Sequence, residues 1–167
     1  MLLLISDANI LIDMEDGNLI PVIFQLPYEI AVPDILFELE LRDRHSHLLQ
    51  AGLKLKSLNS ESVKKTEFLT GQYPRPSMMD NSALALALQE GCPLLTGDKD
   101  LRAAAKKEGV EVHGTIWIIE KLLNQKIIQQ PQAKSSFDSM KVNGSRLPWG
   151  DVDKLLIRYG LVGAQNE

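Results

Sequence analysis

The chain has 167 residues, of which 44% are hydrophobic and 24% charged, as is typical of one globular domain with a core of its own. Its net charge of −4 argues against a protein that coats nucleic acid by charge neutralisation alone, although a bound metal ion would reverse the local field. The N-terminus lacks the basic region of a signal peptide, no apolar run approaches the roughly 20 residues of a membrane span, and the single Cys92 excludes an internal disulfide framework; we therefore expect a cytoplasmic protein without membrane contact.

Short apolar runs alternate with helical patterns along most of the chain. The expected strands cover residues 2–5, 28–32, 53–58, 94–96 and 110–112. The expected helices between them cover residues 18–25, 34–45, 60–70, 77–90, 100–108 and 115–124. This alternation predicts parallel strands joined by right-handed crossovers, with helices on both faces. The expected fold is therefore α/β, a three-layer sandwich around a mostly parallel sheet.

The pattern changes after residue 126, where only helices are expected, at 132–142 and 149–159. About 40 residues seldom hold a hydrophobic core of their own. We therefore expect one domain over residues 1–126 and a C-terminal helical extension over 127–167 that packs on the same domain.

Two expected strands run directly into an acidic residue. Asp7 follows the first strand, and Asp98 follows the strand that begins at Leu94. In open α/β sheets, ligands bind beyond the carboxyl ends of the strands, and a carboxylate buried there costs several kcal/mol unless it is paired or bound to metal. Aspartate is also a common helix N-cap, so each acid alone has an ordinary structural explanation. Together, the two acids indicate a shared site at one edge of the sheet.

Two further acids become candidates for the same site once Asp7 and Asp98 are considered together. Glu38 lies on the expected helix 34–45, whose inward candidates include Leu39, and Asp80 lies in the first turn of the helix 77–90. Each acid again has an ordinary explanation: a solvated helix face for Glu38 and a favourable helix-dipole interaction for Asp80. Neither is informative alone, and their value comes from the set of four.

The segments that carry these four acids resemble the PIN-domain family of metal-dependent nucleases, which includes the VapC-type toxins. The matching segments are residues 6–13, 32–39, 79–87 and 94–101, and residues 110–115 resemble the short last strand and turn of the family. The resemblance covers about residues 1–125. It implies a metal-dependent endoribonuclease with Asp7, Glu38, Asp80 and Asp98 as catalytic residues. One role that it implies for such an enzyme is the toxin of a toxin–antitoxin pair. It also implies an RNA substrate, an antitoxin partner and a homodimer.

The resemblance implies Mg²⁺ or Mn²⁺ as the cofactor, with Asp7 and Asp98 as direct ligands and with Glu38 and Asp80 bound directly or through water. Hard oxygen ligands of this kind are what these ions prefer. Two assignments stay open. Glu40 is the alternative to Glu38, although the register from Pro33 favours Glu38, and Asp100 shares or takes the role of Asp98.

Neighbouring residues complete the expected site. Asn9 and Thr96 are candidates to orient the carboxylates or water by hydrogen bonds, and turn or core hydrogen bonding is their ordinary alternative. Lys99, Arg102 and Arg75 are the candidate contacts to the phosphates of the substrate.

Two other function classes compete with a nuclease. A phosphatase of the haloacid-dehalogenase class needs two aspartates flanking one residue after the first strand, and Asp7-Ala8-Asn9 lacks the second. The stronger alternative is a catalytically silent PIN-like binding or scaffold module in RNA metabolism or regulation. The presence of all four acids favours catalysis over this alternative.

Overall fold

The structure, a computed structural model, describes residues 1–165, and the side chains of residues 1–160. Five strands form one sheet in the order β3-β2-β1-β4-β5, and every neighbouring pair is parallel. The strands are β1 (Leu2–Ser6), β2 (Tyr28–Pro33), β3 (Lys54–Lys56), β4 (Leu94–Leu95) and β5 (Val112–His113). The chain builds the sheet outward from β1 to β3 and then returns to β1 to add β4 and β5 on its other side. The edge between β1 and β4 is thus the topological switch point, where α/β sheets bind ligands.

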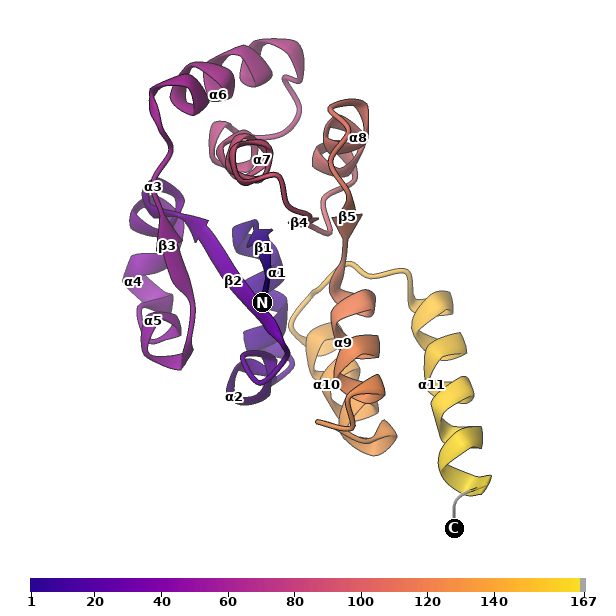
Figure 1. Cartoon of the computed structure of the whole chain (residues 1–167). Coiled ribbons are helices and arrows are strands. Elements are labelled where there is room, and N and C mark those ends of the chain that lie inside the picture. The colour runs from indigo at the N-terminus through magenta and orange to yellow at the C-terminus, as the bar shows by residue number, and fades with distance from the viewer. Residues whose placement is uncertain (166–167) are drawn as a thin grey trace.

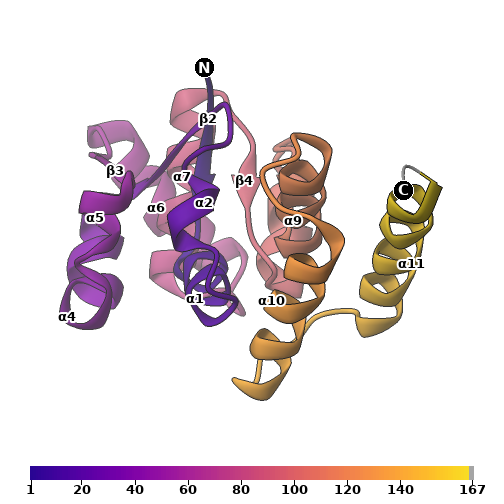
Figure 2. The ribbon, with the colours of Figure 1, turned by 90° about the horizontal axis from the view of Figure 1, so that it is seen from below.

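Helices cover both faces of this sheet, as Figures 1 and 2 show from two directions. One face carries α6 (Ser60–Gln72), α7 (Met78–Glu90) and α8 (Lys99–Lys107). The other carries α1 (Ala8–Asp16), α2 (Ile20–Ile23), α4 (Arg42–His45), α5 (Leu48–Ala51), α9 (Thr115–Asn124) and α10 (Gln130–Val142). The expected three-layer α/β sandwich is confirmed, and its sheet is entirely parallel.

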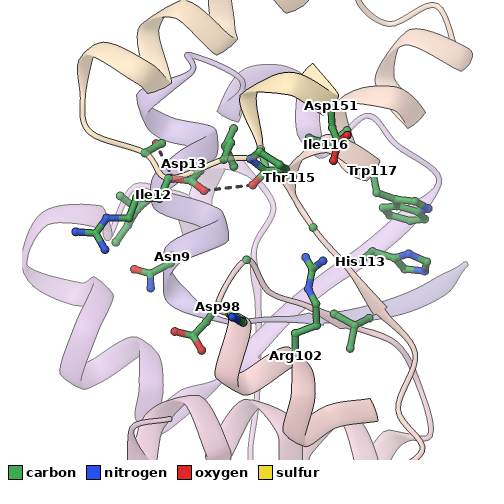
Figure 3. A pocket seen from close by; sticks show the side chains of 18 of the residues that line it. Asn9, Ile12, Asp13, Asp98, Arg102, His113, Thr115, Ile116, Trp117 and Asp151 are labelled. Atoms are coloured by element: carbon green, nitrogen blue, oxygen red, sulfur yellow. Dashed lines mark hydrogen bonds between the residues drawn. The ribbon is translucent and has the colours of Figure 1, made fainter. Parts of the chain in front are cut away.

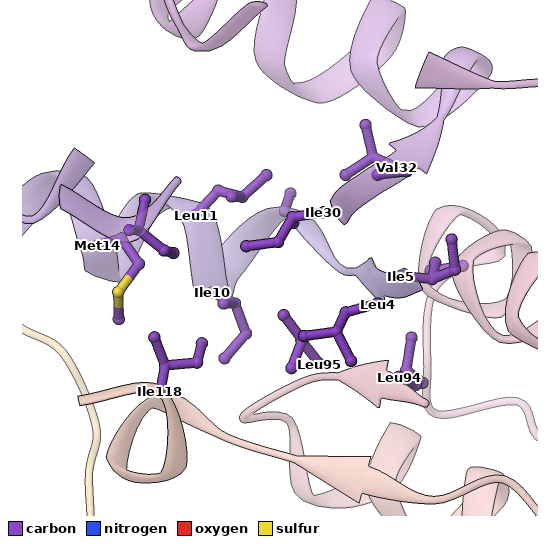
Figure 4. Close-up of a cluster of buried hydrophobic side chains, with 14 of the residues drawn as sticks. Leu4, Ile5, Ile10, Leu11, Met14, Ile30, Val32, Leu94, Leu95 and Ile118 are labelled. Carbon is purple, nitrogen blue, oxygen red and sulfur yellow. The ribbon is translucent and has the colours of Figure 1, made fainter. Parts of the chain in front are cut away.

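The core lies where both faces of the central strands meet the helices. Leu4 and Ile5 of β1 are buried on opposite sides, and Ile10 and Met14 of α1 fill the space beside them (Figure 4). Complete burial of one such side chain contributes about 1.5–3 kcal/mol, so this central packing holds β1 and the start of α1 rigidly. The residue between them, Asp7, is fixed by the same packing.

The chain after β4 and β5 extends the core toward the C-terminus. Phe137 and Met140 of α10 are buried, and the Ser139 hydroxyl donates to the carbonyl of Asp16 at 2.6 Å. α11 (Trp149–Gln165) lies outside α9 and α10 and contacts both (Figure 1). Within residues 127–165 the chain therefore packs against the first part of the molecule; residues 166–167 of the expected extension lie outside the described part. No described helix has both the length and the apolar character that crossing a membrane requires.

Three local expectations differ from the structure. Residues 8–16, for which no helix was expected, form α1, whereas the expected helix 18–25 is only the four-residue α2. The short last strand is displaced to Val112–His113. The expected helix 34–45 is divided into α3 (Asp34–Leu36), a π-helix η1 (Phe37–Leu41) and α4. A π-turn inserts an extra residue and rotates everything after it about the helix axis, so Leu39, expected to face inward, is 68% exposed.

Candidate active site

Asp7 lies at the carboxyl end of β1, where its carboxylate is completely buried. It is the N-cap of α1, because its Oδ1 accepts a hydrogen bond from the Ile10 amide at 3.0 Å. Its Oδ2 accepts a hydrogen bond from the Thr96 hydroxyl at 2.5 Å. Its own amide donates to the Leu95 carbonyl at 3.0 Å, which ties the end of β1 to the end of β4. The backbone and both carboxylate oxygens of Asp7 are thereby held in one orientation.

Thr96 connects Asp7 to Asp98. Its hydroxyl oxygen, which donates to Asp7, also accepts a hydrogen bond from the Asp98 amide at 3.0 Å. Asp98 in turn is the N-cap of α8 and accepts from the Leu101 amide at 2.8 Å. The two acids expected at one sheet edge therefore follow adjacent parallel strands and are linked through one buried hydroxyl.

Asp80 approaches the same edge from the N-terminus of α7. It forms a capping box with Ser77, in which each residue accepts a hydrogen bond from the other's amide at 3.0 Å. Its charge also acts beyond the helix, because it raises the pKa values of both Asp7 and Glu40. Asp80 is thus both a helix cap and a member of the acid group.

The two candidate glutamates point to different places. Glu38 is half exposed and forms an ion pair with Arg42 one turn later, and hydrogen bonding to Arg42 lowers its pKa. Glu40 is also exposed, but partial burial of its carboxyl group and the charge of Asp80 raise its pKa. These charges favour Glu40 over Glu38 as the candidate ligand on this helix, and the choice between the two residues stays a prediction. Both residues lie on the π-helix η1, which interrupts the α-helical spacing after Leu36.

Burial dominates the electrostatics of Asp7. It raises the pKa of Asp7 to about 7; the hydrogen bonds from Thr96 and Ile10 oppose this shift, and the nearby charges of Asp80 and Asp13 add to it. Among the described residues, no lysine, arginine or histidine forms an ion pair with Asp7, Glu40, Asp80 or Asp98. The negative charge of these four acids is therefore not offset by an ion pair within the described part of the chain.

This pKa predicts how stability depends on pH in protein stripped of metal with EDTA. The unfolded-state pKa of an aspartate is about 3.9, so between that value and 7 the folded state binds more protons than the unfolded state. The contribution of Asp7 is then fully present below the unfolded pKa and is lost as pH rises through about 7. An Asp7→Asn variant lacks this loss, so its stability relative to wild type should rise by about 3 kcal/mol between about pH 5 and about pH 8.

Denaturant unfolding of the two proteins at both pH values measures this difference, because all other titrating groups are common to both. A constant difference would contradict the raised pKa of Asp7.

A cleft of about 800 Å³ opens beside Asp98 (Figure 3). Its walls come from the start of α1, the β4–α8 turn, the β5–α9 turn and the segment between α10 and α11. They include Asn9, Asp13, Lys99, Arg102, Trp117 and Arg146. Of the four acids, only Asp98 lines this cleft, so the acid group lies at its margin.

Of the other residues expected at the site, three line this cleft and two lie outside it. Asn9 is exposed on the wall of the cleft, and Lys99, the first residue of α8, also lines it. Arg102 extends into the cleft, and its guanidinium donates to the Thr96 carbonyl at 3.1 Å (Figure 3). Asp100 and Arg75 lie outside and form an ion pair with each other at 3.6 Å. Their expected roles as metal ligand and phosphate contact stay predictions.

Asp13 is a site residue that the sequence analysis did not single out. It lies on α1, two turns after Asp7, and accepts hydrogen bonds from Thr115 at 3.2 Å and from Ser145 at 2.8 Å. It lines the cleft and contributes to the raised pKa of Asp7. Its position at the end of the segment 6–13 was the available signal, but without a helix predicted there nothing placed it on the same side as Asp7.

Comparisons with known proteins bear on this arrangement. A family model described as a PIN domain matches residues 3–160. The chain belongs to the PIN-domain family. Among solved structures, this PIN domain is similar to PAE2754 from Pyrobaculum aerophilum, with 15% identity and a TM-score of 0.51 over 72% of this chain and 95% of that one. It is also similar to SSO1118, a PilT N-terminus domain protein of the archaeon Sulfolobus solfataricus, with 15% identity and a TM-score of 0.46 over 74% of this chain and 92% of that one. No curated protein sequence matches.

The family match confirms the resemblance carried by the four acidic segments. It reaches beyond residue 126 and includes α10 and most of α11. PIN domains are generally nucleases and typically bind divalent metal ions. The similarity to PAE2754, at 15% identity, supports the fold.

Proposed function

We propose that this PIN domain is a Mg²⁺- or Mn²⁺-dependent endoribonuclease that hydrolyses RNA phosphodiester bonds in the cytoplasm. The observation that carries the proposal is the fully buried Asp7, grouped with Glu40, Asp80 and Asp98 at the switch point of the sheet. A scaffold protein gains nothing from this arrangement, because crowded acids repel one another and oppose folding.

The chemistry of these residues fits a hard divalent cation, although among the described residues no three of the four acids bring ligand atoms within 4.8 Å of one another. Carboxylate oxygens are the donors that Mg²⁺ and Mn²⁺ prefer, and the ion's charge would offset the burial that raises the pKa of Asp7. Asp7 and Asp98 would hold the ion, with Asp80 and Glu40 beside them. When bound, such an ion neutralises charge on the phosphate and acidifies a bound water. The hydrogen bond from Thr96 holds the Asp7 carboxylate in one orientation, as hydrogen bonds from neighbouring groups do for metal ligands.

The cleft beside Asp98 supports a polyanionic substrate. Lys99, Arg102 and Arg146 bring three positive charges to its walls, and three carboxylates lie on the same walls, those of Asp13, Asp98 and Asp151. Cations in a cleft raise the local concentration of an anionic substrate and fix phosphates in register. Gly114 leaves the room that Arg102 needs, because a Cβ there would lie 2.8 Å from the Arg102 Nη2.

A toxin role, an antitoxin partner and a homodimer remain predictions from the family resemblance. A small DNA-binding protein that is encoded directly upstream and co-purifies with this chain would support the toxin role.

The cleavage assay uses a mixed-sequence single-stranded RNA with the purified chain and either Mn²⁺ or EDTA. We expect cleavage with Mn²⁺ only, and an Asp98→Asn variant that is slower by at least about 100-fold. A Lys99→Ala, Arg146→Ala double variant should bind RNA more weakly, and the slope of log K against log salt should fall in magnitude by about 0.7 for each lost phosphate contact. Cleavage that persists in EDTA or in Asp98→Asn would contradict the proposal; cleavage of DNA of the same sequence but not RNA would contradict the assigned substrate.

A further inference from the structure

A second group of metal-ligating side chains lies at the opposite end of α1 from Asp7. Glu15, in the last turn of α1, contacts Nδ1 of His45 through one carboxylate oxygen and Nε2 of His47 through the other, the latter at 2.6 Å. One ligand atom from each residue lies within 4.8 Å of the other two. His45 ends α4, and His47 precedes α5. The group therefore joins α1 to a segment about 30 residues later in the sequence.

We propose that Glu15, His45 and His47 bind a transition-metal ion of the Zn²⁺ class. Two imidazole nitrogens and one carboxylate are a donor set that suits Zn²⁺, with water in the remaining position, whereas Mg²⁺ prefers oxygen ligands alone. The burial of the group suits an ion in exchange with solvent: the His45 side chain is 18% exposed and that of His47 is 50% exposed.

The surrounding charge favours a cation at this position. Asp16 lies close to the group, since its pKa is raised by burial and by the charge of Glu15 and lowered by His45. Two carboxylates thus accompany two imidazoles that are neutral when they bind metal. The alternative to a metal site is a cluster in which Glu15 forms hydrogen bonds with the two histidines and no metal ion is bound.

The site is separate from the acid group of the proposed nuclease. Glu15 follows Asp7 by eight residues, which is about 12 Å along a helix axis. An ion bound to Glu15 and His45 would fasten α1, which begins at Asp7, to α4, which directly follows the π-helix carrying Glu40. Its role is structural: it would hold together the two elements that position these acids.

Calorimetric titration of Zn²⁺ into the chelator-treated chain tests the proposal, with excess Mg²⁺ present to occupy the carboxylate site. We expect one Zn²⁺ per chain, and an affinity lower by at least about 100-fold in Glu15→Gln and in His47→Gln. Because the ion binds the folded state, Zn²⁺ should also raise the melting temperature of wild type and not that of Glu15→Gln.

Two matched variants separate this site from the rest of the molecule. His113→Gln removes a histidine outside the group, and Asp98→Asn removes a ligand of the proposed nuclease site; both should bind Zn²⁺ like wild type. The proposal is overturned if wild type binds no Zn²⁺ at micromolar concentration, or if His47→Gln binds it unchanged. A loss in Asp98→Asn equal to that in Glu15→Gln would also overturn it, since the Zn²⁺ would then occupy the nuclease site. Melting curves without Zn²⁺ verify that each variant is folded.

Discussion

An Asp7→Asn variant should lose metal-dependent RNA cleavage by at least about 1,000-fold in kcat/KM, equivalent to about 4 kcal/mol of transition-state stabilisation. Both oxygens of Asp7 are oriented by Thr96 and Ile10, so the variant removes a charged ligand from a rigid position that no neighbouring side chain can replace. Asparagine has nearly the same shape and can still cap α1, so the variant should fold. Single-turnover cleavage with saturating Mn²⁺ measures the loss.

The stability of the Asp7→Asn variant tests whether a loss of activity is caused by unfolding. Removal of a buried carboxylate whose pKa is raised to about 7 should leave the metal-free variant at least as stable as wild type above that pH. Asp153→Asn, on the exposed side of α11, is the matched substitution and should stay within about twofold of wild-type activity. An inactive Asp7→Asn that is also less stable at alkaline pH would contradict the account of this residue, as would one that retains activity.

Glu40→Gln should reduce cleavage by about 100-fold, whereas Glu38→Gln should remain within about twofold of wild type. The two residues lie on the same π-helix, but the charge of Asp80 raises the pKa of Glu40, while Glu38 forms a solvent-exposed ion pair with Arg42. Exposed ion pairs of this kind contribute little to stability, so neither variant should unfold. Cleavage rates of the two variants measured side by side with Mn²⁺ test this assignment, and the reverse order of effects would return Glu38 to the site.

The sequence was most informative where local pattern and topology coincide. Asp7 and Asp98 follow apolar strands, and parallel strands place such residues at the same edge of a sheet. Asp80 was recognisable as the acid in the first turn of a well-capped helix, and the structure retains that cap while bringing its charge to Asp7. The predictions for these three residues required only the periodicity of the strands, a helix start and the strand order. The first two are local features of the sequence, and the third follows from the alternation of strands and helices.

The sequence was less informative where one inserted residue changes a helix face. Periodicity assumes 3.6 residues per turn, so it assigned Leu39 to the interior. The preference for Glu38 over Glu40 came instead from the register of the family motif after Pro33. The π-helix η1 instead buries Phe37 and Leu41 and leaves Leu39 exposed. On the same π-helix, the charge of Asp80 acts on Glu40. Nothing in a single sequence marks a π-turn, because it is selected by packing against the rest of the molecule.

The sequence pattern also could not predict which residues far apart in the chain come together in space. His45 and His47 lack the spacing of a zinc motif, and Glu15 lies on a helix that was not predicted. Because this helix was not predicted, Asp13 was not recognised either. Asp13 accepts hydrogen bonds from Thr115 and Ser145, which lie much later in the chain. In both cases the relevant contacts are set by tertiary packing of α1.

The most direct test of the central claim is a calorimetric titration of Mn²⁺ into metal-free wild type, Asp7→Asn and Asp98→Asn, with Glu15→Gln as the variant that leaves the acid group intact. We predict binding to wild type and to Glu15→Gln, and loss of binding in both aspartate variants, which would assign Asp7 and Asp98 to one metal site. Equal heats in all four proteins, or no binding to wild type at millimolar Mn²⁺, would contradict the claim, and the two aspartates would then be helix caps alone.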